Sequence, residues 1–102
     1  MKKGKVELND KGPFGKTVLM MASEEGLSDV VEFLLSKGAD ANVKDDLNGT
    51  ALMYAAVSGH AQIVGLLLSH GADPNVQRMG KTALDFAIQK GQTECARLLK
   101  QK

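Results

Sequence analysis

The chain has 102 residues, of which 43% are hydrophobic and 25% are charged, and its formal net charge is +1. This length and balance fit one globular domain and argue against a disordered chain or a strongly basic nucleic-acid-binding protein. No apolar run approaches the roughly 20 residues of a membrane span, and the single cysteine, Cys95, excludes an intramolecular disulfide and the usual cysteine zinc sites.

A unit of about 33 residues occurs three times along the chain in one shared register. Its start is visible as Thr17-Val18-Leu19, Thr50-Ala51-Leu52 and Thr82-Ala83-Leu84, and its end as Gly38-Ala39-Asp40-Ala41-Asn42 and Gly71-Ala72-Asp73-Pro74-Asn75. We place a lead-in or truncated repeat at 1–11, repeat 1 at 12–44, repeat 2 at 45–77 and repeat 3 at 78–102, all within one domain. Repeat 3 is one residue shorter between Asn75 and Thr82 than the equivalent stretch of repeat 2.

Each repeat is predicted to contain two short helices. The threonine is suited to cap the first helix, which carries an apolar pair at i, i+3 and ends at a glycine suited to the left-handed position. The second helix carries a stronger apolar stripe, formed by Val30, Val31, Phe33, Leu34 and Leu35 in repeat 1 and by Ile63, Val64, Leu66, Leu67 and Leu68 in repeat 2. Because no single repeat can bury both of its flanks, we expect the three to stack around a continuous core.

The period, the Thr-x-Leu pattern, Gly59-His60 and the Gly-Ala-Asp-x-Asn ends together resemble the ankyrin repeat, from about residue 10 to residue 102. The resemblance implies an all-α repeat, an α-solenoid of three stacked helix-turn-helix repeats with protruding β-hairpin-like loops, called fingers below. It also implies a non-enzymatic protein-binding role. The family's Thr-Pro-Leu-His becomes Thr17-Val18-Leu19-Met20 here, so the proline and the histidine that hydrogen-bonds along the stack are absent.

The start of the chain allows two interpretations. Residues 5–9 resemble the end of a preceding, truncated repeat, because Asn9 lies as far before Thr17 as Asn42 lies before Thr50. The first helix of repeat 1 is apolar rather than capped by polar residues. Either the chain was cut from a larger protein or engineered at this boundary, or residues 1–16 act as a minimal cap.

Few residues in the sequence suggest chemistry. Gly15-Lys16-Thr17 and Gly80-Lys81-Thr82 resemble the end of a phosphate-binding loop, but both lack the earlier glycine that this motif needs. His60 fits the structural Gly-His of the family, Cys95 occupies a core position, and Asp45 is expected to serve a turn. Since no nucleophile–histidine or metal-ligand set is assembled by spacing, we expect no enzyme activity, no cofactor and no metal.

The resemblance places binding on the finger tips and the exposed face of the first helices, together a concave surface. The candidate residues are Phe14, Lys16, Asp46, Leu47, Arg78, Met79 and Lys81 on the fingers, and Glu24, Glu25, Val57, Ser58, Gln89 and Lys90 at the helix ends. Phe14, Leu47 and Met79 each stand three residues before a repeat's threonine, so stacking would align them about 10 Å apart. They form either an exposed binding row or a row that packs finger against finger.

Charge adds an expectation about the partner. Residues 17–44 and 45–77 each carry a net charge of −3, whereas residues 1–16 carry +3 and residues 78–102 carry +4. Glu24, Glu25, Asp45 and Asp46 would then select basic groups. We expect a monomeric cytoplasmic or nuclear adaptor for a protein partner, with no signal peptide, membrane contact or nucleic acid. The alternatives are a regulatory or scaffolding segment of a larger enzyme or channel, or an engineered binder, which the differences between the repeats disfavour.

Overall fold

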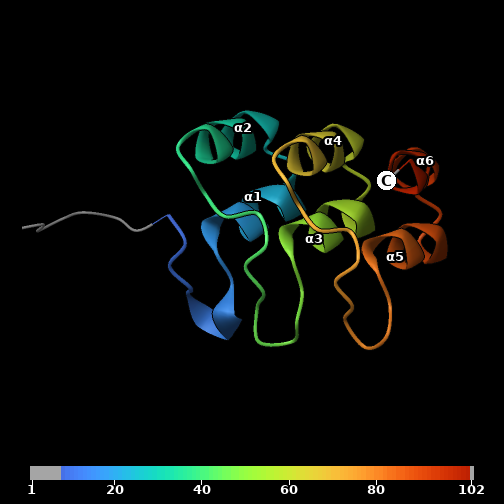
Figure 1. Ribbon diagram of the computed structural model, residues 1–102, viewed down its shortest axis with the longest axis horizontal. Helices are drawn as coiled ribbons and strands as arrows, with labels where there is room; N and C mark the ends of the chain where they lie inside the picture. Colours follow the sequence, from blue (N-terminus) through green and yellow to red (C-terminus); the bar gives the residue numbers. More distant parts are fainter. Residues whose placement is uncertain (1–7, 102) are drawn as a thin grey trace, which may run out of the picture.

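The computed structural model describes residues 8–101, and within that range the chain forms six α-helices in three successive pairs. The pairs are α1 (Val18–Glu25) with α2 (Ser28–Ser36), α3 (Ala51–Ser58) with α4 (Ala61–Ser69), and α5 (Ala83–Gln89) with α6 (Thr93–Lys100). Figure 1 shows α1, α3 and α5 in one layer, α2, α4 and α6 in a second, and the fingers projecting together beside the first layer. The predicted all-α repeat fold is confirmed.

The first helices begin where the threonines predict. The Oγ1 atoms of Thr17 and Thr50 accept hydrogen bonds from the backbone N–H three residues later, at 3.2 and 3.3 Å. Thr82 does the same at 3.3 Å, and the Asp85 carboxylate accepts the Thr82 backbone N–H at 3.0 Å, which completes a capping box. The side-chain cap therefore starts each first helix without the family's proline.

Neighbouring repeats are joined at the end of each first helix. Gly26 and Gly59 both have a φ of 79°, and a Cβ added to them would lie 2.7 Å from the His60 ring and 2.5 Å from the Gln92 amide. His60 Nε2 and Gln92 Nε2 use this space to donate to backbone carbonyls of the preceding repeat, at 3.1 and 3.0 Å. The predicted structural role of His60 is confirmed.

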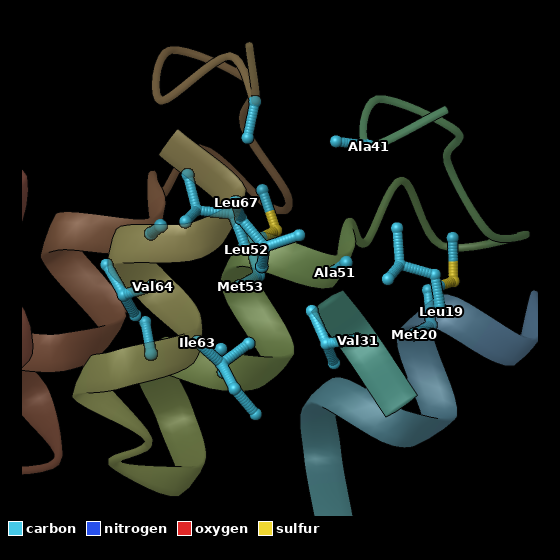
Figure 2. Packing of buried hydrophobic residues seen from close by; sticks show 14 of the residues in the cluster. Leu19, Met20, Val31, Ala41, Ala51, Leu52, Met53, Ile63, Val64 and Leu67 are labelled. Carbon is cyan, nitrogen blue, oxygen red and sulfur yellow. The ribbon is translucent and has the colours of Figure 1, made fainter. Parts of the chain in front are cut away.

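The core lies between the two helix layers and is centred on repeat 2 (Figure 2). Ile63, Val64 and Leu67 on α4 are fully buried, and Leu52 on α3 is 1% exposed. Alanine side chains on α3, also fully buried, leave room for α1 and α5 to pack on either side. Stacking of the repeats thus buries one continuous apolar cluster, as the sequence predicts.

The outer face of repeat 1 differs from the prediction. Val30 and Phe33 belong to the predicted apolar stripe of the second helix, yet they are 39% and 58% exposed, whereas Val31 and Leu35 are buried. Ile63, at the position equivalent to Val30, is fully buried because α4 packs against α2. In the described part of the chain no helix covers the corresponding face of α2, so only part of its apolar stripe is buried.

The three fingers are turns rather than paired strands. No strand occurs within residues 8–101, and one isolated bridge joins Arg78 and Lys81, which exchange both backbone hydrogen bonds at 2.9 and 3.0 Å. Finger 3 (78–81) therefore encloses two residues, whereas in finger 2 (45–49) the Asp45 N–H donates to the Gly49 carbonyl across three residues. Finger 1 (12–16) repeats the longer form. The residue missing from repeat 3 was lost at the finger tip.

A second link between repeats runs through asparagines. Asn42 Oδ1 accepts the backbone N–H of Asp73 at 2.7 Å, and Asn9 Oδ1 accepts that of Asp40 at the same distance. Asn9 therefore does for repeat 1 what Asn42 does for repeat 2, which agrees with the interpretation of residues 5–9 as the end of a repeat. Residues 5–7 of that segment lie outside the described residues.

Candidate functional site

Three large apolar side chains stand at the finger tips. Phe14, Leu47 and Met79 are 79%, 65% and 87% exposed, so they do not cover one another. Fingers 1 and 2 are instead joined through the backbone, because the Asp46 N–H donates to the Phe14 carbonyl at 3.0 Å. The alternative that this row packs finger against finger is wrong, and the row remains an exposed apolar surface.

Two of these tips adopt a backbone conformation that bulky residues avoid. Phe14 has a φ of 62° and Met79 a φ of 54°, while in finger 2 the left-handed residue is Asn48, at 70°. In finger 3 both enclosed residues, Met79 and Gly80, have positive φ, which is the geometry of a type I′ hairpin turn. For an L-residue with a Cβ this conformation costs about 1–2 kcal/mol of free energy, so the exposed methionine does not stabilise the turn.

In repeats 1 and 3, lysine side chains connect the finger to the end of the first helix. Lys16 Nζ lies 3.0 Å from Glu24 Oε1 and 4.7 Å from the centroid of the Tyr54 ring. Lys81 Nζ donates to Gln89 Oε1 at 3.1 Å. The two contacts join equivalent positions of their repeats, from the residue before the threonine to the end of α1 or α5.

In repeat 2 this side-chain contact is absent, and a cavity lies at the equivalent positions. Gly49 and Val57 stand where the other repeats have lysine and its partner. The cavity, called the central pocket below, has a volume of about 120 Å³. Its walls are formed by Glu24, Gly49, Met53, Tyr54, Val57, Ser58, Arg78 and Phe86.

Beneath the pocket, Asp45 fixes the shape of finger 2. Its carboxylate accepts the hydroxyl of Tyr54 and the backbone N–H groups of Leu47 and Gly49, the latter two at 2.9 and 2.7 Å. Burial alone would raise the pKa of Asp45, but these hydrogen bonds and the nearby charge of Arg78 hold it below its usual value. Burial, together with the hydrogen bond to Asp45, raises the pKa of Tyr54 to about 12.

The comparison with known families decides the identity of the fold. A family model described as ankyrin repeats in three copies matches residues 1–78 and, in a second placement, residues 19–102. The chain belongs to the ankyrin-repeat family. A comparison with curated proteins finds no match. Ankyrin repeats are generally protein–protein interaction modules and are typically non-catalytic.

In this ankyrin-repeat chain the acidic candidates are less available than the sequence suggests. Asp45 is only 9% exposed and is engaged in its own turn, so the expectation that it selects basic groups is wrong. Glu24 is exposed but paired with Lys16. Of the four acids predicted to face a partner, Asp46 and Glu25 remain exposed and form no ion pair within residues 8–101.

The remaining candidates of the ankyrin surface lie around the central pocket. Arg78 and Val57 are half-buried in its wall. A second hollow shares Val57, Arg78 and Phe86 with the pocket and is also lined by Met79, Lys81, Gln89 and Lys90. The sequence interpretation missed Met53, Tyr54 and Phe86. The signal that could have found the pocket is the loss of the Lys16–Glu24 pattern at the equivalent positions of repeat 2.

Chemical groups other than these are few in the described part of the ankyrin chain. Between residues 8 and 101, His, Cys, Asp and Glu side chains form no group of three that could hold a metal ion. No helix in the same range is long and apolar enough to cross a membrane. Cys95 is 1% exposed, as predicted from its core position, and burial raises the pKa of its thiol, which leaves it unreactive.

Proposed function

We propose that this ankyrin-repeat domain is a non-enzymatic adaptor that binds a segment of a partner protein across its fingers and first helices. The observation that carries the proposal is the row of Phe14, Leu47 and Met79, which are large, apolar and more than 60% exposed on three successive fingers. Burying one such side chain contributes about 1.5–3 kcal/mol. Three of them supply a contact in the micromolar range after the cost of association.

The strained finger tips add to this proposal. A bulky residue held at positive φ persists only where something other than local stability retains it, and such residues cluster at functional sites. Phe14 and Met79 meet this description, with φ values of 62° and 54° and no burial that would compensate the strain. Retention of both side chains is explained if they contact a partner.

The test is affinity capture from a lysate of the source cells, with the captured proteins identified by mass spectrometry. A variant with serine at Phe14, Leu47 and Met79 should lose the partner that the wild type retains, while circular dichroism shows both to be folded. The matched control replaces the same number of exposed apolar side chains elsewhere.

That control carries serine at Leu27, Val30 and Phe33, which are 50%, 39% and 58% exposed on the outer face of repeat 1. It should keep the partner. A partner retained by the finger variant, or lost equally from both variants, would contradict the assignment of the fingers. If the finger variant instead loses several kcal/mol of stability, the row is structural.

We also infer a second role, for the outer face of repeat 1 itself. Its exposed apolar side chains lie on α1 and α2, on the side from which Asn9 already supplies the link that Asn42 supplies one repeat later. These two observations support packing of a further helical repeat on this face, as in a regulatory or scaffolding segment of a larger protein.

A fusion tests that second role directly. An additional copy of residues 43–75, placed before Asp10 so that Asn75 takes the position of Asn9, supplies one more repeat in register. The free energy of unfolding should rise by at least about 2 kcal/mol, which corresponds to burying one large apolar side chain. An unchanged free energy of unfolding would contradict the proposal.

A further inference from the structure

The central pocket lies at the middle of the proposed binding surface, and Gly49 forms part of its wall. In repeats 1 and 3 the equivalent residues, Lys16 and Lys81, reach from the finger to the end of the first helix, at 3.0 and 3.1 Å. A Cβ at Gly49 would lie 2.8 Å from Asp45 Oδ2. Since Asp45 holds finger 2 together, a larger residue at position 49 would have to displace this carboxylate from its hydrogen bonds.

The walls of the pocket are mainly apolar, and their polar side chains are the cation Arg78, Ser58 and Glu24, which is paired with Lys16. Tyr54 and Phe86 line it from α3 and α5, together with Met53 and Val57. Its volume of about 120 Å³ compares with the roughly 150 Å³ of an engineered cavity that holds one benzene molecule. The pocket therefore has room for a single side chain of medium size.

Arg78 supplies the cation, and the acids around it are already engaged. Arg78 forms no ion pair within residues 8–101, and its Nε is buried without a hydrogen-bond partner there. Glu24 is paired with Lys16, and the carboxylate of Asp45 accepts three hydrogen bonds from Tyr54, Leu47 and Gly49. A guanidinium in such surroundings presents donors that match a carboxylate.

The charge around the pocket rises toward repeat 3. Lys81 and Lys90 line the hollow that adjoins the pocket across Phe86, and Met79 borders the same hollow. No acidic side chain lines that hollow. An acidic side chain in the central pocket thus meets Arg78 directly, with two further cations in the adjoining hollow. Because Glu24, the acid that lines the pocket, is paired with Lys16, this arrangement favours acidic over basic partners on this half of the surface.

We propose that the central pocket binds the side chain of a glutamate within an extended segment of the partner protein, and that an apolar residue next to this glutamate contacts Met79. The two methylene groups of the glutamate pack between Tyr54 and Phe86, and its carboxylate receives hydrogen bonds from Arg78. This inference rests on the proposed function, and it reverses the preference for basic groups that the acidic middle of the sequence suggests.

The probe is a displayed library of random peptides of about a dozen residues, which in extended form span about 40 Å and cross all three fingers. Peptides retained by the wild type are sequenced and then synthesised with an amidated C-terminus. We expect glutamate to be enriched at one position beside an apolar residue. Replacing that glutamate with glutamine should weaken binding to the wild type at least about tenfold.

Arg78→Gln is the deciding variant, with Arg97→Gln as its matched control. Arg97 is on α6, where it pairs with Glu94 and lies outside the pocket. For Arg78→Gln the glutamate and glutamine peptides should bind equally, whereas Arg97→Gln should keep the full preference. Val57→Glu serves as a second variant, because it places an internal carboxylate beside Arg78 and should weaken the glutamate peptide even if Arg78→Gln folds poorly.

The outcomes separate the inference from the proposed function. Peptides that lose binding when the finger tips carry serine, but show no glutamate enrichment or no dependence on Arg78, would overturn the inference alone. A requirement for a free C-terminal carboxylate would also overturn it, because the occupant would then be a chain end. If the wild type retains no peptide at all, both proposals fail.

Discussion

Replacing Met79 with asparagine should make the protein more stable. Met79 has a φ of 54° and precedes Gly80 at 78°, so the two form a type I′ turn between the hydrogen-bonded Arg78 and Lys81. Asn-Gly is the preferred pair for this turn, because asparagine tolerates left-handed angles that cost other residues about 1–2 kcal/mol. The methionine is 87% exposed, so almost no buried area is lost in exchange.

The expected gain is about 1 kcal/mol, which raises the Tm of a domain of this size by about 4–8 °C. Thermal unfolding followed by circular dichroism measures it, and urea unfolding gives the free energy. The matched control is Leu47→Asn, an exposed apolar residue at the equivalent tip whose φ is not positive. It should change stability by less than about 0.5 kcal/mol.

The comparison between the two variants tests the reasoning. If Met79→Asn is no more stable than Leu47→Asn, the backbone of finger 3 carries no strain and the argument from positive φ is wrong. If Met79→Asn is more stable and also loses the captured partner, stability and binding have opposite requirements at this tip. That result would explain why a methionine occupies a turn that favours asparagine.

Three further predictions concern the core, the link between repeats and pH. Ile63→Ala should cost about 2–5 kcal/mol of unfolding free energy, and Val30→Ala less than about 1 kcal/mol, because only Ile63 is buried at this shared position; equal losses in urea unfolding would show that the face at Val30 is covered. His60→Ala should cost about 1 kcal/mol and His60→Gln almost nothing, because glutamine already makes this contact from repeat 3; a glutamine variant as unstable as the alanine variant would refute this. Asp45 has a lowered pKa when folded, so its contribution is complete above the usual carboxyl value of 3.8 and disappears as pH falls through the lower folded value; unfolding of Asp45→Asn should therefore depend less on pH in acid than that of the wild type.

The sequence predicts the parts of this fold that depend on short-range chemistry. The threonine caps and the left-handed Gly26 and Gly59 involve groups within a few residues, and the structure contains them as expected. The stacking also follows, because a fixed period brings equivalent apolar positions together. Alignment of the repeats also shows that repeat 3 is one residue shorter between Asn75 and Thr82, and the structure places this difference in finger 3.

The errors arise where burial depends on residues that are not adjacent in the sequence. The stripe position shared by Val30 and Ile63 carries the same kind of residue in repeats 1 and 2, but its burial is decided by whether another helix pair packs there. For Asp45 the sequence predicts the turn correctly but not the burial, which depends on the side chain of Tyr54, nine residues away. Neither fact is contained in local sequence patterns.

The central pocket shows how one repeat architecture acquires a specific surface. The links that hold the stack together recur between repeats, because His60 and Gln92 make equivalent hydrogen bonds, as do Asn9 and Asn42. At the finger-to-helix position the chain has Lys16 with Glu24, then Gly49 with Val57, then Lys81 with Gln89. The middle pair has no side chain that bridges finger and helix, and the central pocket is lined by this pair.

The cation in the central pocket comes from the next repeat, so the pocket forms only where two repeats are stacked. Arg78 belongs to finger 3, yet it lines a pocket whose remaining walls come mainly from repeat 2. A single repeat in isolation would have the opening or the arginine but never both. Binding of a glutamate peptide should therefore require repeats 2 and 3 to be stacked, and urea should abolish that binding at the same midpoint at which it unfolds the helices. Peptide binding that survives beyond this midpoint would show that the pocket does not depend on the interface between the two repeats.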